Sequence, residues 1–149
     1  MDTGMIIPFT KGIYTFSSHP GDVEKLATQL YYPSYISFES ALAKYGIMNQ
    51  GVNKLTLATT RHSKKLNLMK IECEYCQLKK DYFFGFQLLD GVYLAEPEKT
   101  FLDMIYLISL GKRKIDYSEW YLDGLNKKKI QQYAKKYSSK VREMIGRIL

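Results

Sequence analysis

Three carboxylates and a lysine lie close together near residue 100, and they are the side chains that most invite a catalytic interpretation: Glu96, Glu98, Lys99 and Asp103. Carboxylates with a nearby lysine are typical of metal-dependent nuclease sites. Helix geometry argues against that function, because Pro97 is typical of a first helical turn, where carboxylates stabilise free N–H groups and the helix dipole. Glu98 and Asp103 are also five residues apart and share a helix face poorly.

Asp103 is unusual because it is a lone carboxylate within the apolar run of residues 101–110. An unpaired buried charge is very costly. We therefore expect its carboxylate to accept a hydrogen bond from a neighbouring backbone group or from a tyrosine. No catalytic residue is assigned, and a metal-dependent nuclease is kept as the less favoured alternative.

Cys73 and Cys76 have the spacing of half a zinc site. A second pair of ligands is missing, and His19 and His62 stand alone in the sequence. In an extended strand the two thiols would also point to opposite faces. We therefore expect no metal and no cofactor. Two cysteines do not make a disulfide framework, which favours a reducing, cytoplasmic location.

The net charge of +7 is concentrated at the C-terminal end. Residues 126–149 hold eight Lys or Arg and one Glu, whereas residues 1–125 hold fourteen basic and fourteen acidic residues. Such asymmetry favours an anionic partner such as nucleic acid. Two basic turns precede the tail, and they are interpreted either as ordinary solvated charge or as phosphate contacts that add salt-dependent affinity. The candidate nucleic-acid-binding residues are Lys11, Arg61, Lys64, Lys65, Lys79, Lys80, Lys127, Lys128, Lys135, Lys136, Lys140, Arg142 and Arg147.

The pattern of apolar residues predicts an α+β fold in which a small N-terminal β-hairpin over residues 5–16 is followed by two helices. Asp22 is expected to cap the first helix, and Pro33 ends it. Ser37 is expected to cap the second helix, and Gly46 supplies a left-handed exit. The hairpin belongs to a wing-like unit at residues 1–18, and residues 19–149 form one globular unit.

The middle of the sequence predicts a central mixed or antiparallel sheet of about four strands, at residues 54–60, 66–75, 82–88 and 92–95. A bulge or a turn is expected at residues 69–70, and a hairpin turn is expected at residues 90–91. The C-terminal half is predicted to be helical: a largely buried helix from Pro97 to Gly111, a short helix over residues 115–122, and a tail that breaks at residues 138–139. The tail docks by its apolar face, so its lysines face outward.

Tyr32, Tyr35 and Phe38 surround Pro33 and have two interpretations. They could form a platform for stacking bases, or they could be ordinary aromatics that pack in the core or against a hairpin. The core interpretation is favoured. No apolar run reaches the length of roughly 20 residues that a membrane span needs, so no membrane partner is expected.

Two segments resemble the AbiEi family of antitoxins and transcriptional regulators from prokaryotic type IV toxin–antitoxin pairs. They are residues 32–46 (YPSYISFESALAKYG) and residues 95–103 (AEPEKTFLD). Residues 47–51, 54–65, 83–86 and 138–149 extend the likeness over nearly the whole chain, and residues 5–16 resemble the wing of the family's winged helix-turn-helix. The helices that precede this wing in the family are absent from the sequence.

The resemblance implies a non-enzymatic antitoxin and regulator that counteracts an AbiEii-like nucleotidyltransferase toxin and supports binding of promoter DNA. The chain would then be a truncated or split member of the family, or another polypeptide would supply the recognition helix that reads the operator. A protein-interaction module that completes a separate helix-turn-helix subunit is the alternative. A homo-oligomer is left open.

Overall fold

The computed structural model describes residues 20–48, 53–114 and 116–149, and within these ranges it confirms the α+β class. The predicted N-terminal hairpin, with Lys11 in its turn, lies outside the described residues. The described helices are α1 (Pro20–Leu30), α2 (Phe38–Lys44), α3 (Pro97–Ser109), α4 (Lys127–Ala134) and α5 (Ser139–Ile148). The described strands are β1 (Ser34–Ile36), β2 (Lys54–Thr59), β3 (Lys64–Leu68), β4 (Ile71–Gln77), β5 (Phe86–Leu89) and β6 (Val92–Ala95).

The six strands form one mixed sheet in the order β3-β4-β2-β1-β6-β5, two strands more than the sequence predicts. Antiparallel pairs join β1 to β2, β3 to β4 and β5 to β6, and parallel pairs join β2 to β4 and β1 to β6. Both expected turns are confirmed, because Met69–Lys70 and Asp90–Gly91 each place two residues at positive φ between antiparallel strands. Positive φ at both turn residues matches the right-handed twist of a two-residue hairpin.

The additional central strand is β1, and all three of its residues are buried. A strand that is buried on both faces shows no alternation of apolar and polar residues, so its sequence carries no period-2 signal. β1 pairs with β2 through Tyr35 and Ala58 and meets β6 through Ile36 and Leu94. It therefore joins the two halves of the sheet.

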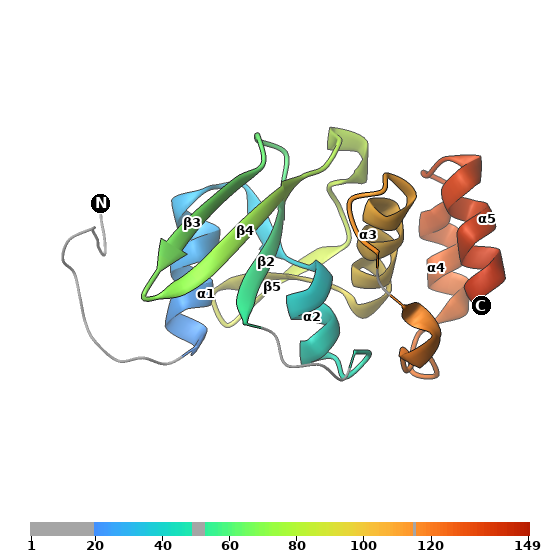
Figure 1. Cartoon of the computed structure of the whole chain (residues 1–149), viewed down its shortest axis with the longest axis horizontal. Helices are drawn as coiled ribbons and strands as arrows, with labels where there is room; N and C mark the ends of the chain where they lie inside the picture. The colour runs from blue at the N-terminus through green and yellow to red at the C-terminus, as the bar shows by residue number, and fades with distance from the viewer. Residues whose placement is uncertain (1–19, 49–52, 115) are drawn as a thin grey trace.

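Helices cover both faces of the sheet (Figure 1). α1 packs on one face through Val23 and Ala27, which share a hydrophobic cluster with Leu57. α3 packs on the other face through Phe101 and Ile105, and α4 and α5 lie against the far side of α3. α3 is buried from Glu98 to Leu107, as the sequence predicts.

The helix ends agree in part with the predictions. α1 begins two residues before Asp22, so Asp22 lies in its first turn and is not its cap, while the helix ends before Pro33 as expected. Gly46 has φ +72°, which confirms the left-handed exit from α2. The short helix expected over residues 115–122 is confirmed only in part. In the described part of that segment a 3-10 helix forms at Tyr117–Glu119, and the side chain of Asp116 caps it by accepting a hydrogen bond from the N–H of Ser118.

A polar cluster is sealed inside the fold where β1, α2 and α3 meet. Lys99 and Asp103, one turn apart on α3, form an ion pair, and neither residue is exposed to solvent. Tyr35 and Ser37 donate hydrogen bonds to Oδ2 of Asp103 at 2.8 and 2.7 Å. The expected tyrosine partner of Asp103 is therefore confirmed. Ser37 is at the start of α2, but its hydroxyl binds Asp103 and does not cap the helix, which corrects the sequence prediction.

The chain before β5 closes over Lys99. Gly85 has φ +74°, and a Cβ there would lie 2.9 Å from Cγ of Lys99, so only glycine fits. The ring of Phe84 lies 4.8 Å from the Lys99 ammonium. Burial lowers the pKa of Lys99 and raises that of Asp103, while their mutual charge opposes both shifts.

Removal of the Asp103 carboxylate should destabilise the fold strongly. Asp103→Ala leaves the Lys99 charge buried without a partner, and we expect a loss of about 3–5 kcal/mol in the free energy of unfolding. The double variant Lys99→Met/Asp103→Leu should lose clearly less stability than the single variants Lys99→Met and Asp103→Leu lose in sum, because it removes both charges together. Urea unfolding measures all of these variants, with exposed Lys25→Met as the control. An Asp103→Ala variant within about 0.5 kcal/mol of wild type would contradict the prediction.

Candidate nucleic-acid interface

The two glutamates at the start of α3 anchor the C-terminal helices. The Glu96 carboxylate accepts a hydrogen bond from the Tyr133 hydroxyl at 2.7 Å and pairs with Lys129 at 3.1 Å. The Glu98 carboxylate accepts a hydrogen bond from the N–H of Asn126 at 3.0 Å. The position of both carboxylates is thus explained by the docking of α4. Neither the Glu96 side chain nor that of Ser37 caps its own helix.

The C-terminal helices dock by an apolar face, as predicted. Ile130 and Ala134 of α4 and Val141 and Ile145 of α5 are buried in the cluster that includes the α3 core. The helices separate at the expected break, where the hydroxyl of Ser138 accepts a hydrogen bond from the N–H of Val141 and caps α5. The remaining faces of α4 and α5 are therefore open to solvent.

All seven predicted basic residues of the tail are exposed. We call them the tail surface: Lys127, Lys128, Lys135, Lys136, Lys140, Arg142 and Arg147. None of them forms an ion pair with another described residue. Three contact uncharged groups: Lys136 lies over the Phe84 ring at 4.3 Å, Lys140 donates to the Ser109 carbonyl at 2.8 Å, and Arg142 donates to the Tyr137 carbonyl. The tail surface therefore carries positive charge that the described structure leaves uncompensated.

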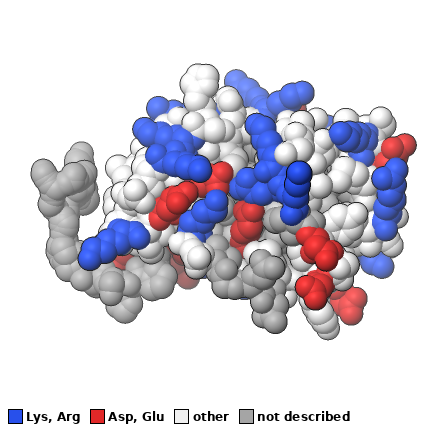
Figure 2. Space-filling model, viewed as in Figure 1, with Lys and Arg blue, Asp and Glu red and all other residues white. Residues whose placement is uncertain are grey.

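Basic side chains also gather over the strands on the face shown in Figure 2. Arg61 stacks on the ring of Tyr31 at 4.0 Å, and the Lys64 ammonium lies 5.0 Å from the same ring. At the other predicted turn, Lys79 lies 6.0 Å from the ring of Tyr82, and Lys80 is exposed. The basic residues of both predicted turns are thus exposed, but Lys64 and Lys65 belong to strand β3 and not to a turn.

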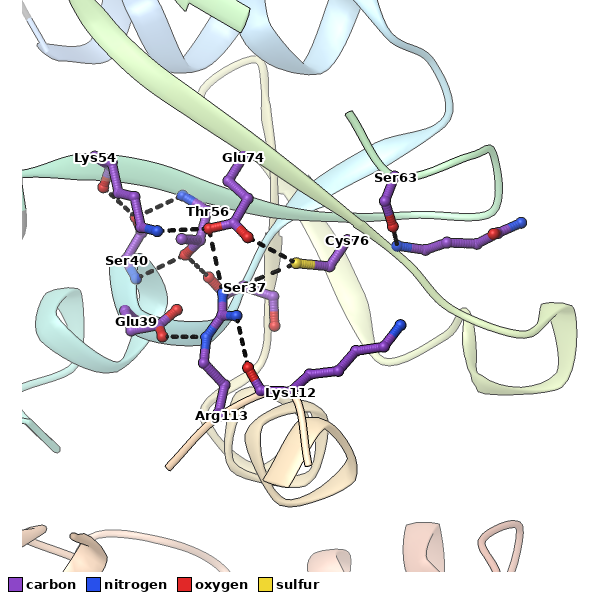
Figure 3. Close-up of polar contacts among 11 residues, drawn as sticks. Ser37, Glu39, Ser40, Lys54, Thr56, Ser63, Glu74, Cys76, Lys112 and Arg113 are labelled. Atoms are coloured by element: carbon purple, nitrogen blue, oxygen red, sulfur yellow. Dashed lines mark hydrogen bonds and ion pairs between the residues drawn. The ribbon is translucent and has the colours of Figure 1, made fainter. Parts of the chain in front are cut away.

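The structure brings the first basic turn against two cations that the sequence analysis missed. Lys64 and Lys65 line a groove of about 480 Å³ together with Lys112 and Arg113, which follow α3. Arg113 is fixed in place by Glu39 of α2 and Glu74 of β4 (Figure 3). The sequence shows Lys112 and Arg113 as a basic pair directly after the predicted helix. It does not show that they lie beside β3, because that depends on the tertiary fold.

The remaining candidates are structural. Cys73 and Cys76 are free and buried on opposite faces of the sheet, as expected for a strand, and burial raises their pKa to about 12 and about 11. Among the described residues, no group of three or more His, Cys, Asp or Glu could hold a metal ion. Tyr35 and Phe38 belong to the core, which confirms that interpretation for both, whereas Tyr32 is 61 % exposed.

No protein-family model matches the sequence, and no curated protein matches it significantly. In the described residues, no helix has both the length and the apolar character that a membrane crossing requires.

The docking of α4 should depend on pH through Glu96. Burial would raise the pKa of Glu96, but hydrogen bonds from Tyr133 and Lys129 outweigh it and lower the pKa. A carboxylate with a depressed pKa contributes stability above its unfolded pKa of about 4.3, and that stability is lost as the pH falls through the folded value. Glu96→Gln should therefore cost about 1 kcal/mol at pH 7 and flatten the acid limb of the stability curve. Urea unfolding from pH 7 to pH 3 measures this, with exposed Glu143→Gln as the matched control. If the stability curves of wild type and Glu96→Gln had the same slope at acid pH, the prediction would be contradicted.

Proposed function

We propose that this chain is an AbiEi-like antitoxin and transcriptional regulator that contacts DNA through its basic surface and has no catalytic activity of its own. The observation that carries the DNA-binding part is the tail surface. It presents seven basic side chains, on α4, on α5 and in the segment between them, that are exposed and form no ion pair with another described residue. The antitoxin part rests on the family resemblance of residues 32–46 and 95–103.

The contacts beneath the tail surface hold its helices in a fixed position. α4 is held by Glu96 and Glu98, and both tail helices are seated on α3 by buried apolar residues. The lysines are therefore presented by a fixed scaffold, which lowers the entropic cost of binding. Exposed lysine ammonium groups act as point charges towards phosphate oxygens, so they support affinity without reading bases.

The buried position of the acidic residues supports a role other than catalysis. Lys99 and Asp103 are fully buried and satisfied by each other and by Tyr35 and Ser37. A general acid or base needs to come within hydrogen-bond reach of a substrate, either directly or through one water molecule. Glu96 and Glu98 are engaged by α4 in the same way. These contacts support the regulatory proposal over the nuclease alternative.

Binding to duplex DNA should depend steeply on salt. If the tail surface contacts about four phosphates, affinity should fall by about 10²-fold between 50 and 200 mM monovalent salt. The variant Lys128→Gln/Lys135→Gln should weaken binding at each salt concentration and reduce the salt slope by about two. Fluorescence anisotropy with a labelled duplex measures both quantities. The matched control is Lys25→Gln/Lys70→Gln, which removes two exposed charges outside the tail surface.

Absence of duplex binding at low salt, or binding that does not depend on salt, would contradict the DNA-binding part of the proposal. The same follows if the tail variant and the control variant are indistinguishable. For the antitoxin part, the chain should relieve growth arrest when it is co-expressed with an AbiEii-like nucleotidyltransferase toxin. Unrelieved arrest at matched expression would reject that part alone.

A further inference from the structure

The groove beside the β3–β4 hairpin is a second concave basic feature, distinct from the tail surface. It lies between β3, β4 and the chain that follows α3, and its volume is about 480 Å³. Three cationic side chains and one carboxylate of its lining share one face of the sheet: Lys65, Lys112, Arg113 and Glu74. Lys64 also borders the groove, but its ammonium lies 5.0 Å from the ring of Tyr31 on the opposite face. Three positive charges against one negative charge leave two in excess. Concave surfaces lined by one sign of charge focus the electrostatic potential, so this groove favours an anion.

The floor of the groove is electrically balanced and held rigidly. Nε of Arg113 donates to Oε2 of Glu39 at 2.6 Å, and its Nη2 lies 3.3 Å from Oε1 of Glu74. Nζ of Lys54 lies 2.6 Å from the same Glu74 oxygen. The contacts join α2, β2, β4 and the segment after α3, as Figure 3 shows. Two cations and two carboxylates cancel, so the floor itself contributes no net charge.

The excess charge therefore belongs to two lysines on the rim. Lys65 and Lys112 are exposed, and neither forms an ion pair with another described residue. Ser63 adds a hydroxyl that accepts a hydrogen bond from the N–H of Gln77 at 2.9 Å and keeps its own proton to donate. The Glu74 carboxylate would repel an anion at the floor. An anion should therefore sit at the rim, between Lys65 and Lys112.

We infer that this groove is a phosphate-binding site in which Lys65 and Lys112 hold a single phosphate group between them. Phosphate oxygens are strong acceptors, and two ammonium groups from separate segments can contact different oxygens of one tetrahedral anion. The phosphate belongs either to a nucleic-acid backbone or to a free nucleotide. The backbone source rests on the function proposed above and would add a second contact to the one made by the tail surface.

The test uses the full chain as wild type, a groove variant (Lys65→Gln/Lys112→Gln) and the control variant Lys25→Gln/Lys70→Gln. Inorganic pyrophosphate, ATP and a short DNA duplex are titrated separately. Backbone amide shifts in ¹H–¹⁵N spectra report where each probe binds, and anisotropy reports duplex affinity against salt. All four substituted lysines are exposed, so the variants should retain the wild-type spectrum elsewhere.

We expect pyrophosphate to cause saturable amide shifts at Ser63, Lys65, Lys112 and Arg113. These shifts should be lost in the groove variant and kept in the control variant. If the source is a nucleic-acid backbone, the duplex shifts the same amides, and the groove variant binds it about tenfold more weakly with a salt slope reduced by about two. If the source is a nucleotide, ATP shifts them at lower concentration than the duplex does.

Two outcomes separate failure of this inference from failure of the proposed function. If the duplex binds through the tail surface while no probe shifts the groove amides, the groove is not a phosphate site and the proposed function stands. If pyrophosphate or ATP saturates the groove while wild type fails to bind duplex at low salt, the phosphate site stands and DNA binding fails. Equal pyrophosphate affinity in the groove variant and the control overturns the inference directly.

Discussion

The buried ion pair between Lys99 and Asp103 is the contact on which the arrangement of the fold depends. α3 carries both residues and lies between the sheet and the C-terminal helices, and the Lys99 ammonium lies 5.9 Å from the ring of Tyr137, which follows α4. Tyr35 brings the central strand β1 to the carboxylate, and Ser37 brings the corner that leads into α2. That corner also holds Phe38 at φ 59°, an unfavourable conformation for a side chain of this size. Without the Asp103 carboxylate, the corner would lose its main polar anchor.

The same contact explains why the acidic residues and the lysine of α3 are buried in the fold, whereas the unpaired basic residues lie on its surface. Burial of Lys99 is tolerated because Asp103 and the hydroxyl of Tyr35 satisfy it. Glu96 and Glu98 are used one turn earlier to attach α4. With these carboxylates consumed by internal contacts, the basic residues of the tail surface and of the groove rim have no described acidic partner. Because the buried charges neutralise one another, the tail surface and the groove rim keep their positive charge.

Much of this architecture could be predicted from local sequence. Pro97 and the apolar run after it predict α3, and the break at Ser138 predicts two tail helices, because caps and helical periodicity are local signals. The hairpin turn at Asp90 was equally visible. By contrast, β1 was missed because all three of its residues are buried and show no alternation. Within residues 115–122, the described part forms only the 3-10 helix Tyr117–Glu119, which the side chain of Asp116 caps. Such helices are used in short pieces, because their hydrogen-bond geometry is poorer than that of an α-helix.

The candidate site was predictable only as a set of basic residues. The tail surface follows from charge and periodicity, so all seven of its residues were identified from sequence. The groove was not, because Lys112 and Arg113 lie about fifty residues from Lys64 and Lys65 along the chain and meet them only through the tertiary fold. The ion pairs of Arg113 with Glu39 and Glu74 have the same origin. The sequence showed which charges exist, whereas the fold determined which of them are neutralised.

The central claim is that nucleic acid is contacted by the exposed basic residues while the acidic and lysine residues of α3 serve the fold. Amide hydrogen exchange of the full chain, measured with and without duplex DNA at low salt, tests this claim most directly. The account predicts added protection in α4, in α5, at residues 61–65 and at residues 112–113, with no change along the β5–β6 hairpin. Protection confined to β5 and β6, or no protection anywhere with duplex in excess, would contradict it.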